Sequence, residues 1–539
     1  MAVQRQRMAR LHASWDWQFK RISVIITCQQ SDPNMSLIKY ASKVSALTLL
    51  SRLMGFVRDA ILAQSFGAKS GFDLFLLAFK VPNMMRRIFA EGAFSQAFIP
   101  VLAEYEEQSP DRRKEFLNAV YSCLGIVTIL LTVVVCMGCE LALRWGSPWL
   151  GQSPRMALFL RLLQVTFPYL VLITITGFYS AALQARKQFS MAALTPTFFN
   201  IVFSLGALLS SMYLSEPIYG AAVTVLVGGV MQVALMGHGY LKLYGMPKMM
   251  LSNLDTGIFK LFRLMCAGMY GASVAQIGMA IDSVILSMLT AGSVSWIYYA
   301  ERLSYLPLGV FGASIVTVLS PSLAKSCQAN DTKRFQKQVA WGVISAGIIG
   351  IPSAIGLSIL AKPVVATLFL RGKFTLHDVN QTAAALQVFA LGIPAYMWIK
   401  VFAGAFYARQ ETWIPVQCAT AALGVNVAIG CVGAYYLAHV GIAYAVAASA
   451  YANAALLYWQ LNKSHVFQFT TNDIRKLTKV ATASMFTFAS VSWLPEITLW
   501  IDLTMLSQLV YLSTALCLSL AGYGALLWVM ALDWRSPSA

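Results

Sequence analysis

Nine charged residues lie within forty positions of this 539-residue chain, against a strongly apolar background. They are Arg52, Arg58, Asp59, Lys69, Asp73, Lys80, Arg86, Arg87 and Glu91. A charged side chain at the centre of a membrane helix costs roughly 2.5–3.5 kcal/mol, so these groups must face protein or water rather than lipid. Six positive and three negative charges leave a surplus of three positives. This surplus suits an anionic ligand, because arginine forks match phosphate oxygens with paired hydrogen bonds.

The second half of this stretch places its polar residues along one helical face. Asp73, Lys80 and Arg87 are seven residues apart, and residues at this spacing lie almost above one another on a helix. Glu91 follows Arg87 by four positions and Asn83 follows Lys80 by three, which extends the polar stripe. The pattern therefore predicts that one side of this helix lines a polar space.

The helix that precedes it carries the remaining charges. Arg52 and Asp59 share one face, whereas Arg58 points about 120° away from it. Two alternatives compete with an anion-binding cavity. In the first, the charges neutralise one another as the ion pairs Arg52–Asp59, Lys80–Asp73 and Arg87–Glu91. In the second, they flank the membrane at its interface. The positive surplus favours the cavity.

Further charges lie in the second half of the chain. Glu301 and Arg302 stand near the start of the helix that we expect over 295–322, within SVSWIYYAERLSYLP. Asp282 and Lys400 are isolated charges inside apolar segments. For Asp282 the alternatives are a coupling-cation ligand and a local pair or hydrogen bond. For Lys400 they are the cavity wall and the membrane interface.

The elements that must position these residues are membrane-spanning helices. The chain is 58% hydrophobic and 12% charged, whereas a soluble protein carries about twice that charge. Several uncharged runs exceed the roughly 20 residues that span a bilayer. We therefore expect an all-α polytopic membrane protein. Its fourteen transmembrane helices are expected over 37–66, 71–99, 117–143, 156–183, 191–214, 219–241, 260–289, 295–322, 338–361, 380–407, 412–436, 440–461, 477–496 and 503–531, with the turn between the eleventh and twelfth near His439, Val440 and Gly441.

The distribution of positive charge predicts the orientation of these helices. Loops after even-numbered spans, together with the C-terminus, hold 19 Lys and Arg residues, and loops after odd-numbered spans hold seven. Because positively charged loops stay in the cytoplasm, we expect both termini there. The same distribution accounts for most of the net charge of +18, so nucleic acid is not an expected partner.

The two halves of the chain resemble each other weakly. The matches are PVLAE from Pro100 and PSLAK from Pro321, QAR ending at Arg186 and YAR ending at Arg409, and Asn200 and Asn426, which are 221, 223 and 226 residues apart. This offset covers six spans, so both halves enter the membrane in the same orientation. The pattern predicts two pseudo-symmetric six-helix lobes around a central cavity, as in many transporters.

We accordingly divide the chain into four parts. They are a basic N-terminal extension over 1–34, an N-terminal lobe over 35–241 (spans 1–6), a C-terminal lobe over 242–461 (spans 7–12) and two additional helices over 462–539. The extension lacks the apolar length and cleavage site of a secretory signal. It is expected to be a disordered cytoplasmic tail or the product of an upstream start.

Motifs of the common enzyme classes are missing. The chain has no GxxxxGK[ST], GxSxG or HExxH, and its five histidines lack metal-ligand spacing. These absences favour a secondary carrier over an enzyme.

Four stretches of the sequence resemble a known family. The stretches SRLMGFVRDAILAQSFGA, FDLFLLAFKVPNMMRRIFAEGAFSQAFIPVLAEY, GSVSWIYYAERL and LLYWQL are similar to those of the bacterial MurJ (MviN) family. The resemblance runs from about Met35 to the last span. It implies a fourteen-helix protein of the MOP exporter superfamily, located in the bacterial inner membrane.

The resemblance also implies roles for individual residues. Carried over by position, the functional arginines of the family fall on Arg52, Arg58, Arg86 and Arg302, and its essential acidic residue falls on Asp73. Neighbouring cavity residues of the family match Lys80, Asn83, Arg87 and Glu91. Tyr305 stands where some members carry an acidic residue, and Glu301 is the alternative carboxylate here.

The cargo that the resemblance implies is lipid II, the undecaprenyl-pyrophosphate-linked disaccharide pentapeptide. It would be moved from the cytoplasmic to the periplasmic leaflet by alternating access, with the arginines on its pyrophosphate. No cofactor is implied; the membrane potential would drive transport, and a sodium site in the C-terminal lobe is compatible with the resemblance. Membrane lipids and other cell-wall synthesis proteins are the implied partners.

Three other functions compete with this one. The first is a flippase or exporter for another polyprenyl-linked saccharide, which composition does not separate from lipid II. The second is a cation-coupled drug exporter of the same superfamily, whose cavity would favour acidic and aromatic residues. The third is a non-transporting scaffold, which would not need uncompensated arginine inside the membrane.

Overall fold

The computed structural model describes residues 37–89, 93–145, 153–249, 256–489 and 497–531. Within these ranges the chain is helical and contains no strand. The extension over 1–34 and Glu91 lie outside the described residues, as does the side chain of Arg87.

In the first half of the chain, the described residues form eight helices. They are α2 (Leu37–Phe66), α3 (Ser70–Phe89), α4 (Ala93–Glu106), α5 (Pro110–Trp145), α6 (Pro154–Thr166), α7 (Tyr169–Ala185), α8 (Phe189–Tyr213) and α9 (Pro217–Tyr244). Proline opens α5, α6 and α9, where its missing N–H leaves no hydrogen bond unmade. The span expected over 156–183 is divided into α6 and α7 at Phe167 and Pro168, because an interior proline removes a helical hydrogen bond.

The second half repeats this order. Its elements are α10 (Thr256–Ser287), α11 (Ser293–Pro307), a π-helical segment (Leu308–Gly312), α12 (Ala313–Gln328), α13 (Thr332–Ile359), α14 (Ala361–Phe369), α15 (Leu376–Leu391), α16 (Ile393–Ala408) and α17 (Trp413–Lys463). Helix α17 bends at Ala438, whose φ is 49°, next to the turn expected at 439–441. The C-terminal part contains α18 (Thr471–Ala489), α19 (Ile497–Asp502) and α20 (Met505–Val529).

Matching helices begin and end at a constant offset. Helices α5 and α13 begin at Pro110 and Thr332, 222 positions apart (332 − 110). Helices α7 and α16 end at Ala185 and Ala408, 223 positions apart (408 − 185). The sequence repeat is therefore accompanied by a repeat in where these helices begin and end. The lobe boundaries at 241 and 461 remain a prediction.

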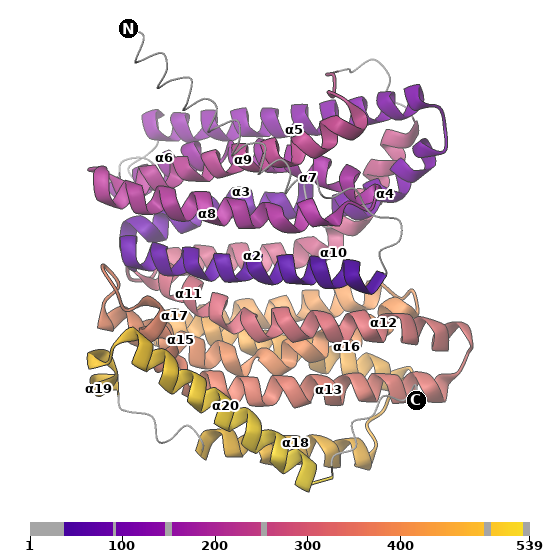
Figure 1. Cartoon of the computed structure of the whole chain (residues 1–539), viewed down its shortest axis with the longest axis vertical. Helices are drawn as coiled ribbons and strands as arrows, with labels where there is room; N and C mark the ends of the chain where they lie inside the picture. Colours follow the sequence, from indigo (N-terminus) through magenta and orange to yellow (C-terminus); the bar gives the residue numbers. More distant parts are fainter. Residues whose placement is uncertain (1–36, 90–92, 146–152, 250–255, 490–496, 532–539) are drawn as a thin grey trace, which may run out of the picture.

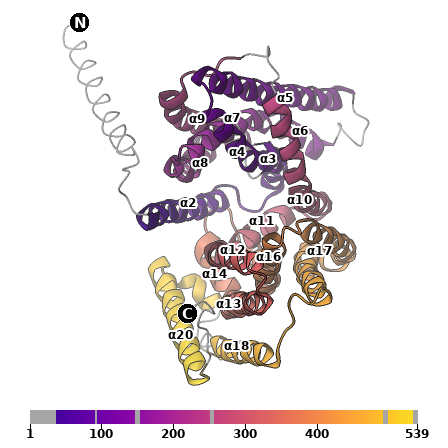
Figure 2. The same ribbon diagram turned by 90° about the vertical axis from the view of Figure 1, so that its right-hand side faces the viewer.

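The helices form two bundles that lie one beside the other. Figure 1 shows α3–α9 in one bundle and α11–α17 in the other, with α2 and α10 near the boundary between them. Figure 2 shows the same two bundles after a quarter turn, with α18 and α20 on the outer side of the second bundle. The helices of each bundle run roughly parallel to the boundary, as expected of spans that cross one membrane.

The composition of the helices is that of a multi-pass membrane protein. Among the described residues, eight helical segments are long and apolar enough to cross a membrane, and one of them is the bent α17. Large apolar side chains such as Leu130, Val134 and Met137 on α5 are 58–62% exposed, as expected of a surface solvated by lipid. The count of fourteen spans is not established by these criteria, because helices such as α2 and α3 carry the charged residues.

The two bundles share a hydrophobic core at one end. One cluster of buried side chains joins Phe72 and Phe203 of the first bundle to Trp296 and Phe369 of the second. At the other end there are two further clusters: one unites α4, α5, α7, α9 and the start of α10, and the other unites α12, α13, α16 and α17. At that end, α10 is therefore the helix of the second half that packs into the core of the first bundle, and α12, α13, α16 and α17 form a core of their own.

Polar contacts close the joined end. The Asp73 carboxylate, on α3, accepts hydrogen bonds from the backbone N–H groups of Gly292 and Ser295 at 2.6 and 2.9 Å, at the start of α11. A carboxylate at this position satisfies N–H groups that lack helical partners. These bonds tie the first bundle to the second.

A backbone clasp lies beside this cap. The N–H of Lys373 donates to the carbonyl of Gln64, at the end of α2, at 3.0 Å. Gly67 and Gly372 both have positive φ, 63° and 58°. A Cβ on Gly67 would collide with the Lys373 carbonyl, and one on Gly372 would collide with the Gln64 carbonyl. Glycine is therefore required on both sides of the clasp.

Candidate functional site

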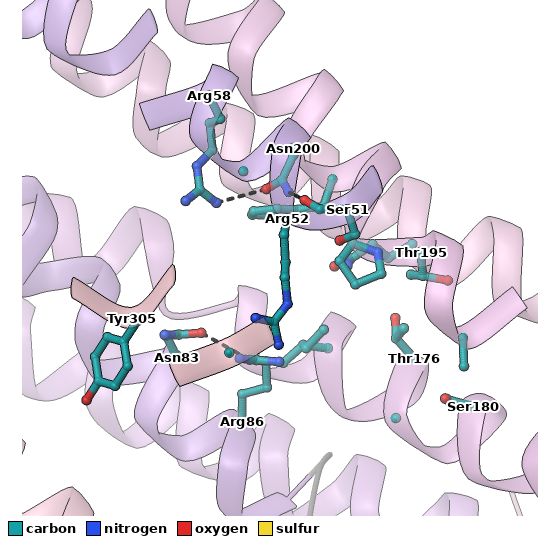
Figure 3. Close-up of a pocket in the computed structure, with 18 of the residues that line it drawn as sticks. Ser51, Arg52, Arg58, Asn83, Arg86, Thr176, Ser180, Thr195, Asn200 and Tyr305 are labelled. Atoms are coloured by element: carbon teal, nitrogen blue, oxygen red, sulfur yellow. Dashed lines mark hydrogen bonds between the residues drawn. The ribbon is translucent and has the colours of Figure 1, made fainter. Parts of the chain in front are cut away.

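A cavity of about 1020 Å³ lies between the two bundles and contains most of the arginines singled out from the sequence. Helix α2 contributes Arg52 and Arg58, α3 contributes Asn83 and Arg86, and α11 contributes Arg302. Figure 3 shows the labelled residues of α2, α3, α7 and α8 around the same space. The cavity also reaches Gln96 and Gln184, toward the end where the cores of the two bundles are separate.

The charge of the cavity wall is strongly positive. Its lining contains five cationic side chains, Arg52, Arg58, Arg86, Arg302 and Lys400. Among the lining residues that the structure describes, Asp59 is the one carboxylate. The wall therefore carries a positive excess, and of the two alternatives left open for Lys400 the structure shows the cavity wall.

Asp59 links two of these arginines across the boundary between the bundles. The Arg58 guanidinium donates to Asp59 Oδ1 at 2.7 and 3.0 Å, and Arg302 Nε lies 3.6 Å from Asp59 Oδ2. The Tyr298 hydroxyl donates to the same carboxylate at 2.9 Å, and the Arg302 guanidinium stacks 5.1 Å from the Tyr298 ring centroid. The Asp59 side chain is only 2% exposed, so it acts as a buried counter-ion.

Arg58 is held by a second partner on α8. Its guanidinium donates to Asn200 Oδ1 at 2.9 Å, and the Asn200 amide nitrogen donates to the Ser51 carbonyl at 3.2 Å (Figure 3). Sequence spacing placed Arg58 about 120° from the face of Arg52. From that position its long side chain reaches Asp59 and Asn200, which the sequence alone did not predict.

Arg52 and Arg302 present their charge to the cavity. The Arg302 side chain is 48% exposed and Arg52 is also exposed, although both lie inside the molecule. Asp59 pairs with Arg58 and Arg302 rather than with Arg52. The Arg52–Asp59 ion pair that was the alternative to a cavity is therefore not formed, and the Arg52 guanidinium stays available to an anion.

Two residues of α3 complete the cationic side of the cavity. Arg86 donates from Nε to Asn83 Oδ1 at 3.0 Å, one turn earlier on the same helix. This bond fixes the direction of the guanidinium, so Asn83 acts as its support (Figure 3).

The other predicted site residues do not meet in this cavity. Asp73 is fully buried at the joined end, where it caps α11 instead of pairing with Lys80. Lys80 lines two smaller cavities on the opposite side of α3. The polar residues of α3 are therefore divided between different cavities. Because each residue of a helix is rotated by about 100° from the one before, Asn83 and Arg86 face the large cavity whereas Lys80 faces the two smaller ones. For Glu91 and the Arg87 side chain, which lie outside the described parts, the roles remain predictions.

A smaller cavity of about 270 Å³ lies in the second bundle. Asp282, Glu301 and Lys80 line it, together with Asn426 and Asn453. The Asn426 amide nitrogen donates to Asp282 Oδ1 at 2.8 Å, so the local hydrogen bond expected for Asp282 is formed. The Oδ1 atoms of both asparagines are buried without a partner among the described residues.

Neutral polar side chains form the rest of the wall of the large cavity. Figure 3 shows Thr176, Ser180 and Thr195, from α7 and α8, on this side. Gln232 of α9 and Tyr169 of α7 also line the cavity. The Tyr169 hydroxyl donates to Gln232 at 3.2 Å. The cavity therefore has a cationic side near the second bundle and a neutral side within the first.

Comparison with known proteins places this architecture in a family. The family model "Lipid II flippase MurJ" matches residues 62–512. The chain belongs to the MurJ family. It is 36% identical over 500 residues to a probable lipid II flippase MurJ of Haemophilus influenzae, covering 89% of this chain and 97% of the relative. It is 32% identical over 510 residues to the lipid II flippase MurJ of Burkholderia cenocepacia, covering 93% and 98%.

Solved structures agree on the fold. The structure of "Lipid II flippase MurJ, inward closed conformation" is similar with a TM-score of 0.75 at 23% identity, over 90% of this chain and 99% of that chain. An inward-facing multidrug resistance MATE transporter of the MOP superfamily is similar with a TM-score of 0.63 at 14% identity, over 79% and 98%. This chain therefore has the same fold as both of these transporters.

Sequence reasoning missed two residues that organise the arginines of this MurJ-family chain. Asp59 appeared only as a counter-ion for Arg52, and Asn200 appeared only as a marker of the repeat. Both are polar residues inside apolar spans. This feature of the sequence indicates that each of them needs a partner within the protein. Their actual partner, Arg58, could be identified only once α2 and α8 were placed side by side.

Proposed function

We propose that this protein flips lipid II from the cytoplasmic to the periplasmic leaflet, and that its cavity arginines bind the pyrophosphate. The observation that carries the proposal is the five-cation wall with a single described carboxylate, inside a member of the MurJ family. Such a wall favours a dianionic phosphate group and repels a cationic drug, which argues against the drug-exporter alternative. The polyprenyl tail would remain in the bilayer, and no covalent chemistry is required of the protein.

Alternating access is the mechanism that this architecture supports best. The bundles share a core at the end that contains the Asp73 cap and the Gln64–Lys373 clasp. At the other end α12, α13, α16 and α17 form a core separate from that of the first bundle, into which only the start of α10 packs from the second half. By the distribution of positive loops, the separate end is cytoplasmic. In this conformation the cavity would receive cargo from the inner leaflet. Opening of the Asp73 cap and of the clasp would release cargo on the periplasmic side.

The membrane potential is the proposed driving force, with sodium as a candidate coupling ion. The smaller cavity offers oxygen atoms that suit a hard cation: the Asp282 carboxylate and the unpartnered Oδ1 atoms of Asn426 and Asn453. Bound sodium would supply one positive charge beside Asp282. The protein would hold this ion through side chains of α10 and α17 alone.

Substitution of single arginines tests the cargo site. Arg52→Ala, Arg58→Ala and Arg302→Ala should each abolish growth of a strain depleted of its own lipid II flippase, while protein levels stay unchanged. Lys362→Ala, on α14 outside the cavity lining, is a matched control that should support growth. Full growth of all three arginine variants would contradict the anion site.

A direct assay tests the cargo itself. Depletion of this protein from its native cells should increase the fraction of lipid II that stays in the inner leaflet. An unchanged lipid II distribution, with accumulation of another polyprenyl-linked saccharide, would favour the alternative cargo.

A crosslink tests alternating access. In a variant without native cysteines, Gln64→Cys with Lys373→Cys should form a disulfide across the clasp and stop transport. Reduction should restore it. Transport by the oxidised protein would contradict opening at this end.

A further inference from the structure

The helix that carries Arg302 changes form at the cavity. Between α11 and α12, residues Leu308–Gly312 form a π-helical turn. Such turns are rare within helices and recur at functional sites, because they widen the helix and redirect its side chains. Leu308 and Gly309 of this segment line the large cavity. The position of the segment therefore raises the question of which cavity residue it serves.

Gly309 lies directly against the Arg52 guanidinium. A Cβ built on residue 309 would stand 2.8 Å from Arg52 Cζ and would overlap one of its terminal nitrogens. Arg52 belongs to α2 and Gly309 to the second bundle, so this contact crosses the boundary between the bundles. Arg52 extends from α2 into the cavity (Figure 3). The absence of a side chain at position 309 thus leaves the space in which the guanidinium rests.

The same turn faces a second cation. A Cβ on Gly312 would stand 3.3 Å from Lys400 Nζ, which comes from α16. Both glycines of the π segment therefore face cationic side chains of the cavity lining. No hydrogen bond or ion pair holds either Arg52 or Lys400 within the described part of the chain. Their positions are set by shape rather than by a counter-ion, which leaves their charge for a ligand.

We propose that Gly309 is a positioning residue for cargo binding, which seats the Arg52 guanidinium against the second bundle so that its fork faces the phosphate. This inference rests on the proposed function, because it assigns Gly309 a role only if Arg52 binds the cargo anion. A methyl group at 309 displaces the fork, and two-point binding of phosphate depends on its direction.

The substitution Gly309→Ala separates this role from folding. The atoms that a new Cβ would meet are the far end of a flexible side chain, so Arg52 moves and the backbone does not. Gly404→Ala is the matched control, because Gly404 lies on a helix of the same bundle and a Cβ there meets nothing within 4 Å. Both variants should have the melting temperature of the parent protein or a slightly higher one, because alanine favours helix.

Binding of fluorescently labelled lipid II to the full chain in nanodiscs measures the effect. Arg52→Ala should weaken binding about tenfold or more, as expected for one lost charge-assisted contact. Gly309→Ala should weaken it by a similar factor, and Gly404→Ala should leave it unchanged. In the Arg52→Ala background, Gly309→Ala should have no further effect, because the group it displaces is gone.

The outcomes distinguish the inference from the function on which it rests. If Arg52→Ala weakens binding while Gly309→Ala behaves like Gly404→Ala, the positioning role is overturned and the anion site stands. Equal losses from Gly309→Ala with and without Arg52 would also overturn it, because the effect would not pass through the guanidinium. Unchanged binding by Arg52→Ala would overturn the proposed role of Arg52, and the inference with it.

Discussion

Arg58 in the first bundle and Asp282 in the second occupy corresponding positions, 224 residues apart (282 − 58). Each forms a hydrogen bond with an asparagine of its own bundle, and Asn200 and Asn426 are themselves a repeat pair. The same pair of helix positions therefore contains an arginine beside an asparagine in the first bundle and an aspartate beside an asparagine in the second. The comparison suggests that a duplicated scaffold was kept while the charge of its polar site was reversed.

The asparagines adapt to this reversal by turning their amides. Asn200 directs Oδ1 to Arg58 and its nitrogen to the Ser51 carbonyl, so both ends of the amide are satisfied. Asn426 directs its nitrogen to Asp282 and leaves Oδ1 without a partner among the described residues. A carboxamide serves either charge because it contains both a donor and an acceptor. The first bundle thus has a completed arginine site, whereas the second has an oxygen site that is open to a cation.

Removing the counter-ion of the first bundle should have the largest effect. Asp59→Ala leaves Arg58 buried without its carboxylate and breaks the contact to Arg302. Loss of one partner of a buried ion pair costs about 3–5 kcal/mol, so the free energy of unfolding should fall by that order. Chemical unfolding in detergent measures this change, and growth of a flippase-depleted strain should be lost with it.

The repeat supplies a control for this variant. Ser283 stands 224 positions after Asp59 (283 − 59), and its hydroxyl bonds to the Met279 carbonyl of its own helix. Ser283→Ala should change the free energy of unfolding by no more than about 1 kcal/mol. Equal losses from the two variants would show that position, not charge, governs stability here.

The sequence predicted the helices and the repeat on which this contrast rests, but not the contrast itself or its geometry. Long apolar runs located the helices, and the turn near Gly441 is the bend at Ala438, because these features depend on local composition. The direction of Arg58 and the exclusion of Lys80 from the large cavity depend on how α2, α3 and α8 pack. The π turn follows Pro307, which cannot donate a helical hydrogen bond, but the sequence did not predict that the interruption would take the form of a π-helical turn.

Introducing a carboxylate into each amide site should sharpen the comparison. Asn200→Asp places a second anion beside Arg58, which preserves the fold but neutralises part of the cavity charge. Binding of labelled lipid II should weaken about tenfold, the equivalent of one charge-assisted contact. Asn426→Asp places a carboxylate beside Asp282, where like charges repel. Asn426→Asp should therefore lower the melting temperature of the protein, and addition of sodium should raise that melting temperature again.

Isosteric controls define what would contradict that expectation. Asn200→Leu removes the hydrogen bonds without adding charge, so it should lower stability more than Asn200→Asp does and weaken binding less. If both Asn200 variants weaken binding equally, the hydrogen bond rather than the cavity charge is decisive. If sodium stabilises Asn426→Asp no better than potassium or choline does, the oxygen site has no preference for that ion.

The smallest effect is expected where the two bundles bring opposite charges to one space. Lys80 from α3 and Glu301 from α11 stand 221 positions apart (301 − 80) and line the same small cavity with Asp282. Because no ion pair joins Lys80 to either carboxylate, their coupling should be about 0.5–1 kcal/mol. Lys80→Glu should therefore lower stability modestly, and Glu301→Lys in the same chain should restore it. Additive losses in the double variant, measured by unfolding in detergent, would show that Lys80 and Glu301 act independently of each other.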